Sequence, residues 1–223
     1  MTDRAERRIV WANPGDAAAV ADRIASEIAS PDHKSFDQKR SDQKRSGPIR
    51  IAVPGGSTPQ QVLALLAERQ LDWTGVTLCL TDDRKVADDH PASNYRALAS
   101  ALGGSGARME RLVEGAVVEP FDLVWLGMGE DGHVASLFPH MVAVVRRGPA
   151  VIATTPIPLP PEAPFERLSL NKTALKATRE LILVIRGARK KAIVEQALAG
   201  SDAWPVSDFL RGDGPPVTIY WSE

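Results

Sequence analysis

The feature that most constrains this chain is an alternation of short apolar runs with segments of helical periodicity. The runs that predict strands occupy residues 8–12, 49–53, 76–80, 121–126, 151–154, 181–185 and 217–221, with further strand positions at Leu168 and Leu170. The predicted helices occupy residues 16–30, 59–69, 93–102 and 190–199, a stretch near Ala174, and a stretch beginning at about His133. Short apolar strands that alternate with helices form largely parallel sheets covered on both faces. The expected fold class is therefore α/β.

Residues 31–48 interrupt this alternation. They are polar and without periodicity, and they contain a tandem near-repeat, DQKR at 37–40 and again at 42–45. Mixed charge on low complexity is typical of a solvated, flexible loop, although a basic docking arm is an alternative interpretation. The 223 residues suit one large α/β domain or at most two small ones. We predict a single domain, 1–223, with a charged insertion at 31–48.

Charge and cysteine content exclude several classes of protein. The formal net charge is −1, which gives no reason to expect nucleic acid or an anionic membrane as a partner. The N-terminus has no apolar signal core, and no stretch approaches the roughly 20 apolar residues that span a bilayer. The single cysteine, Cys79, lies in an apolar run and is expected to be a buried strand residue, which fits a reducing compartment. The expected location is the cytoplasm.

A glycine pair follows the predicted strand 49–53. Gly55 and Gly56 allow the backbone to turn sharply and to approach a ligand closely, and Ser57 and Thr58 offer hydroxyls that can cap the next helix. The free N–H groups of a helix N-terminus favour anions. The segment lacks the lysine pattern of a nucleotide P-loop. It predicts either a phosphate-binding turn or an ordinary capped connection.

A second glycine-rich turn follows the strand 121–126. Residues 127–132 match the pattern Gly-x-Gly-x-x-Gly, but the region 146–155 contains no acidic residue to bind a ribose, and the motif lies past the middle of the chain. We therefore expect no nicotinamide cofactor. The histidines outside this turn lack the spacing of metal ligands, so no zinc site or other metal site is expected.

The same turn ends in Asp131-Gly132-His133. A histidine at the carboxyl end of a strand is well placed to take a proton from water, and Asp131 could orient its ring. The alternative is a helix-capping aspartate with an incidental surface histidine.

Four segments taken together resemble the 6-phosphogluconolactonase family. They read GGSTP at 55–59, TDDR at 81–84, DHPASNY at 89–95 and GMGEDGHVASLFP at 127–139. The likeness continues through 167–170 to 187–190 and covers nearly the whole chain. It implies a Rossmann-like α/β fold without a cofactor and hydrolysis of 6-phosphogluconolactone, a phosphorylated sugar lactone, in the second step of the oxidative pentose phosphate pathway.

The resemblance also assigns roles to individual residues. His133 matches the family's general base and Asp131 its acidic neighbour, which makes these two the expected catalytic residues. The expected substrate-binding residues are Gly55, Gly56, Ser57, Thr58, Arg84, Asn94 and Lys190. The spacing from Gly187 favours Lys190 over Lys191, which is expected to be solvated together with Arg189. Two positions depart from the family pattern: Asp83 stands in place of glutamate, and His140 in place of glycine.

Two other functions are alternatives to the lactonase. A glucosamine-6-phosphate deaminase shares the Asp-Gly-His turn, but it carries a catalytic glutamate where this chain has Phe138. A non-catalytic sugar-phosphate sensor would carry an added domain, for which this chain has no room. The sequence leaves the oligomeric state open between monomer and homodimer.

Overall fold

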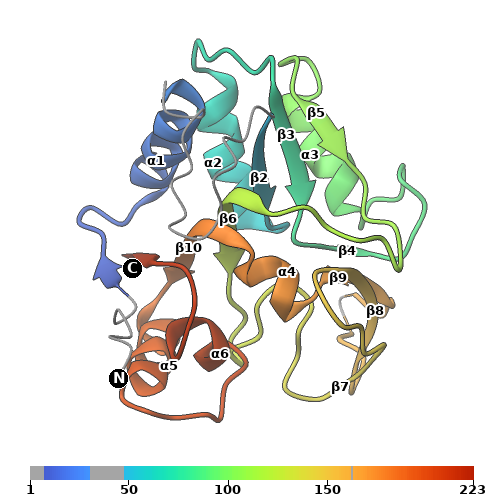
Figure 1. Ribbon diagram of the computed structural model, residues 1–223, viewed down its shortest axis with the longest axis vertical. Helices are drawn as coiled ribbons and strands as arrows, with labels where there is room; N and C mark the ends of the chain where they lie inside the picture. Colours follow the sequence, from blue (N-terminus) through green and yellow to red (C-terminus); the bar gives the residue numbers. More distant parts are fainter. Residues whose placement is uncertain (1–7, 31–47, 162) are drawn as a thin grey trace.

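A computed structural model of the protein describes residues 8–30, 48–161 and 163–223. Its main feature is a seven-stranded sheet in which every neighbouring pair is parallel, in the order β1-β11-β10-β6-β2-β3-β5 (Figure 1). The strands are β1 (Ile9–Trp11), β2 (Ile49–Val53), β3 (Val76–Leu80), β5 (Arg108–Glu110), β6 (Phe121–Gly127), β10 (Thr178–Arg186) and β11 (Val217–Ser222). The predicted α/β class is confirmed. The predicted insertion lies, apart from Pro48, outside the described residues.

Helices connect these strands, and several begin at a polar cap. They are α1 (Ala17–Ala29), α2 (Ser57–Ala67), α3 (Asn94–Leu102), α4 (Lys172–Lys176), α5 (Ala188–Leu198) and α6 (Ser207–Leu210). Asp16, Ser93 and Asn171 each accept a hydrogen bond from the backbone N–H three residues later. Such caps satisfy backbone donors that have no partner within the helix. Over the described ranges, none of the helices is long and apolar enough to cross a membrane.

Both faces of the large sheet are covered by helices. Alternate residues of its central strands point to opposite sides, so each strand contributes to two cores. In β6, Leu123 and Trp125 pack in a core with α1, α2 and α3. Val124 and Leu126, between and after them, pack in a second core with α4, α5 and α6. Figure 1 shows the first three helices grouped in the upper part of the molecule and α5 and α6 in the lower part.

A second, antiparallel sheet was not predicted. Its order is β4-β9-β8-β7, formed by β4 (Asp82–Arg84), β7 (Met141–Ala143), β8 (Val151–Pro156) and β9 (Arg167–Leu170). β4 is polar and only three residues long, so it carries no apolar pattern that predicts a strand. Its pairing with β9 sets Arg84 directly opposite Arg167.

One predicted helix is wrong. The chain from His133 forms tight turns, in which Gly129 N–H bonds to the carbonyl of His133 at 2.9 Å and Leu137 N–H to that of Val134 at 3.0 Å. Gly132 and Ala135 have φ angles of 75° and 48°, in the left-handed region that ends a right-handed helix. This backbone keeps His133 beside the end of β6.

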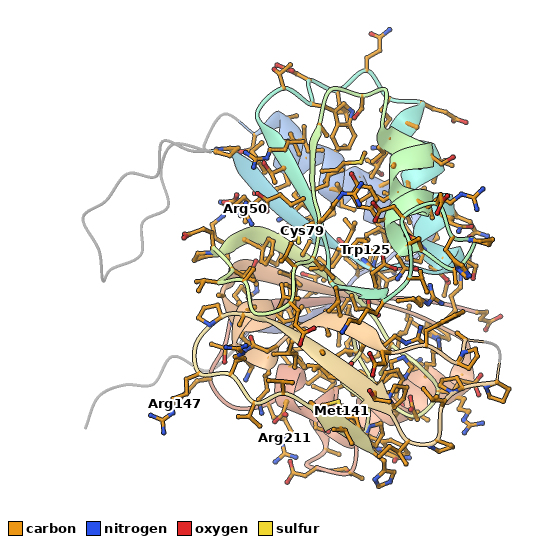
Figure 2. The ribbon with its side chains drawn as sticks, turned by 90° about the vertical axis from the view of Figure 1, so that its right-hand side faces the viewer. Arg50, Cys79, Trp125, Met141, Arg147 and Arg211 are labelled. Atoms are coloured by element: carbon orange, nitrogen blue, oxygen red, sulfur yellow. The ribbon has the colours of Figure 1, made fainter. Side chains whose placement is uncertain are left out.

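The prediction for Cys79 is confirmed. Its side chain is buried in β3, and burial raises the pKa of its thiol to about 12. A thiol with a pKa this high is protonated at neutral pH and is a poor nucleophile. Figure 2 places Cys79 beside Arg50 in the upper part of the molecule, away from Met141 of β7 near the bottom.

Candidate active site

A pocket of about 290 Å³ opens where the carboxyl ends of β2, β6 and β10 meet residues of the antiparallel sheet. Ligands of open parallel sheets bind at this end of the strands. Its lining includes Trp125, which is fully buried and lies near the centre of the molecule in Figure 2. The pocket is lined by residues from all four segments of the resemblance, namely Gly55, Gly56, Ser57, Thr58, Arg84, Asn94 and His133, and also by Lys190 of α5.

The glycine pair meets two separate requirements. A Cβ on Gly55 would lie 2.1 Å from side-chain atoms of Asn94, so the close contact of these two loops requires glycine. Gly56 has a φ of 109° and is itself the N-cap of α2, with no side-chain hydrogen bond at the cap. The expectation that Ser57 or Thr58 caps this helix is therefore wrong. Both lie in its first turn, beside N–H groups that favour an anion.

Asp83 holds the start of α3 against β4. Its carboxylate is buried and accepts backbone N–H bonds from Arg84 at 2.7 Å, Asn94 at 2.7 Å and Tyr95 at 2.9 Å. The amide of Asn94 donates to the carbonyl of Asp82 at 3.0 Å and accepts from the Arg84 guanidinium. The orientation of the Arg84 side chain thus depends on Asp83.

We expect Asp83→Asn to lower the free energy of unfolding by about 1.5–3 kcal/mol, the typical worth of a hydrogen bond to a charged group. Both carboxylate oxygens of Asp83 accept N–H bonds, and the asparagine must turn its own N–H₂ toward one of those donors. Urea denaturation measures the change. Asp89→Asn, at an exposed position in the following loop, is the control. Equal stability of the two variants would contradict this account of Asp83.

His133 and Asp131 form a local pair. The Nδ1 atom of His133 lies 2.5 Å from Oδ1 of Asp131, and the backbone N–H of His133 also donates to that oxygen at 3.2 Å. Burial raises the pKa of Asp131, but the hydrogen bond and charge of His133 outweigh it, so the pKa lies below its ordinary value. Asp131 is therefore ionised at neutral pH and can orient the imidazole. It does not line the pocket and reaches it only through His133.

Two neighbours hold the imidazole ring of His133. The ring of Phe138 lies 4.4 Å from it, centre to centre. A Cβ on Gly129 would lie 2.1 Å from its Cε1 atom, so this position requires glycine. The ring is fixed between an aromatic side chain, a backbone turn and a carboxylate.

The pocket carries four cationic side chains, of which sequence reasoning identified two. Arg167 and Arg186 join Arg84 and Lys190, and none of the four forms an ion pair with a carboxylate of the described residues. Unpaired cations that converge on one pocket favour an anionic ligand. The sequence signal for Arg186 is its position alone: it ends β10, immediately before Gly187.

Arg167 is the most constrained of the four cations. It is 5% exposed, its Nη2 donates to the carbonyl of Ala163 at 2.9 Å, and its buried Nη1 has no partner among the described residues. Burial, and after it the charge of Arg84, lowers the pKa of Arg167, which still remains protonated at neutral pH. A buried guanidinium with a free donor beside a second arginine is a strong site for a phosphate.

The two adjacent lysines of α5 face different surroundings. Lys190 lines the pocket, whereas the Nζ of Lys191 lies 4.1 Å from the ring centre of Trp221 and 4.0 Å from Glu195. Arg189 is exposed and pairs with Glu130 at 3.2 Å. No group of three or more His, Cys, Asp or Glu side chains that could hold a metal ion occurs in the part of the chain that the structure describes.

Comparison with known proteins decides the family. The family model for glucosamine-6-phosphate isomerases/6-phosphogluconolactonase matches residues 15–107 and 103–218. A protein of Rhizobium meliloti named 6-phosphogluconolactonase is 36% identical, over 96% of this chain and 97% of its own. The chain belongs to the glucosamine-6-phosphate isomerase/6-phosphogluconolactonase family.

Relatives within this family agree in fold and length. A crystal structure of a 6-phosphogluconolactonase from Shewanella baltica superimposes with a TM-score of 0.75 at 31% identity, covering 98% of this chain and 99% of that one. A protein of Pseudomonas aeruginosa named 6-phosphogluconolactonase is 32% identical over 95% of this chain and 93% of its own. Both of these relatives carry the lactonase name of the family.

Proposed function

We propose that this protein hydrolyses 6-phospho-D-glucono-1,5-lactone to 6-phosphogluconate. The observation that carries this proposal is a carboxylate-oriented histidine, His133, lining one pocket together with four cationic side chains. A histidine of this kind suits general-base chemistry, and the cations suit a phosphorylated substrate. The lactonase relatives described above support the same reaction.

In the proposed reaction, His133 takes a proton from water as the water oxygen bonds to the lactone carbonyl carbon. The bond between that carbon and the ring oxygen then breaks, and His133 returns the proton to the departing oxygen. Asp131 keeps the imidazole oriented and stabilises its charged form. A lactone is an activated ester, so the step needs no covalent nucleophile and no metal.

We assign the phosphate group of the substrate to the cationic side chains and N–H donors of the pocket. Arg84, Arg167, Lys190 and the N-terminus of α2 supply charge and N–H donors for a dianion. Backbone N–H groups of the glycine-rich turns are suited to stabilise the developing oxyanion. Binding energy gained at the remote phosphate then serves to orient the reacting carbon.

The deaminase and the sensor are less well supported. Phe138, at the position where the deaminase carries its glutamate, packs on the ring of His133 and offers no carboxylate for proton transfer. The His133–Asp131 pair is the arrangement of an active base, which a sensor does not need. We place the enzyme in the cytoplasm, where its single buried thiol stays reduced.

The test is to generate the lactone in situ and to follow its decay with and without the protein, against spontaneous hydrolysis. Acceleration well above that baseline supports the proposal. A folded protein that leaves the rate of lactone decay unchanged contradicts it. Release of ammonia from glucosamine 6-phosphate would instead support the deaminase.

A further inference from the structure

One carboxylate stands among the cations of the pocket. Of the side chains that line it, Asp82 is the only acidic one in the described part of the chain, and it shares the pocket with Arg84, Arg167, Arg186 and Lys190. Asp82 is the first residue of β4 and is half-buried. A negative charge weakens the attraction of this pocket for a phosphate. Neither the proposed proton transfer nor phosphate binding uses it.

The Asp82 carboxylate is held in one orientation by hydroxyl donors. Its Oδ2 accepts from the Ser136 hydroxyl at 2.6 Å, and its Oδ1 accepts from the Thr81 hydroxyl at 3.1 Å. Ser136 is itself buried, and its backbone N–H donates to the Ser169 hydroxyl at 3.2 Å. The carboxylate is therefore fixed from two sides without an ion pair.

Two neighbours do not use up the acceptor capacity of this group. An ionised carboxylate offers about four lone-pair positions, and the Thr81 and Ser136 hydroxyls occupy two of them. The other polar side chains of the pocket are mainly N–H donors, which suit phosphate and carbonyl oxygens. A sugar ring also presents hydroxyl donors, and these need an acceptor.

We infer that Asp82 accepts a hydrogen bond from a ring hydroxyl of the lactone and makes the enzyme selective for a hydroxylated ring. This inference rests on the proposed function, because it concerns the same pocket and substrate. A site built to bond a substrate hydroxyl discriminates strongly against the analogue that lacks it, since its own polar group is then left without a partner. Phosphate binding alone gives no such selectivity.

The experiment measures kcat/KM of wild type and of Asp82→Asn on four substrates: the parent lactone and its 2-deoxy, 3-deoxy and 4-deoxy forms. For wild type, we expect kcat/KM for one deoxy lactone to fall about 10- to 150-fold below the parent, the equivalent of a hydrogen bond to a charged group. Asp82→Asn should lose a similar factor on the parent lactone. On that one deoxy lactone the variant should differ little from wild type, because the interaction is already absent.

The matched control is Glu130→Gln, which removes a charge of the same sign from an exposed position on the neighbouring turn. We expect it to leave the ratios of kcat/KM between the four lactones unchanged. Equal losses by Asp82→Asn on all four lactones would show a merely structural role and overturn the inference. Wild-type enzyme that hydrolyses all four lactones equally well would overturn it without any variant. A wild type inactive on the parent lactone contradicts the proposed function instead.

Discussion

Replacing His133 by alanine is expected to lower kcat for lactone hydrolysis by about 10²–10⁴-fold, the usual contribution of a positioned general base. The reason is that His133 is the only pocket-lining histidine of the described residues and is oriented by Asp131. The substrate KM should change little, because the four cations of the pocket remain. Initial rates over a range of lactone concentrations, corrected for spontaneous hydrolysis, separate kcat from KM.

The control for this variant is His140→Ala, which removes an exposed histidine that lies outside the pocket. It should retain wild-type kcat. A second comparison is Arg84→Ala, for which we expect a raised KM and a smaller change in kcat. If His133→Ala and Arg84→Ala lowered kcat equally and left KM unchanged, the proposed division between base and phosphate site would be wrong.

Replacing Arg167 by methionine is expected to raise KM by about 10²-fold. The guanidinium is buried, and its free Nη1 and its proximity to Arg84 suit a phosphate oxygen. Loss of a hydrogen bond to a charged group costs about 1.5–3 kcal/mol, or about 10- to 150-fold in affinity. Methionine keeps much of the buried volume, which limits the loss of packing.

Binding of inorganic phosphate to Arg167→Met, measured by calorimetry, tests the same assignment without turnover. Arg189→Met is the control, because Arg189 is an exposed cation paired with Glu130 outside the pocket. The variant of Arg167 should lose phosphate affinity and the control should not. If both variants bound phosphate as tightly as wild type and Arg167→Met had a lower kcat, Arg167 would not be the residue that binds the phosphate.

Local features of this protein were predictable from the sequence. The apolar runs that form β2, β3, β6 and β10 follow from hydrophobic patterning, and the helices that start after Asp16 and Ser93 follow from capping residues. Asp131 and His133 are two residues apart in one turn, so their contact also depends mainly on local backbone. Gly55 could be singled out as a turn residue.

The error at His133 also has a local cause. The apolar positions after it are compatible with a helix, but Val134 makes isolated bridges to Met128 and to Leu137. Ala135 adopts a left-handed φ that nothing in its side chain favours. Contacts with the end of β6 therefore override the helical pattern of the apolar residues. Hydrophobic periodicity in the sequence does not reveal such contacts.

The sequence by itself determined the α/β class, the strand-to-loop positions at which the candidate site lies, and the presence of Asp131 and His133 in one turn. Only the tertiary structure decided that Gly55 packs on Asn94, that Asp83 binds the start of α3, and that β4 sets Arg84 beside Arg167. The physical reason is that periodicity and capping act over a few residues. The joining of segments far apart in the chain depends on which strands pair and on how their side chains fit.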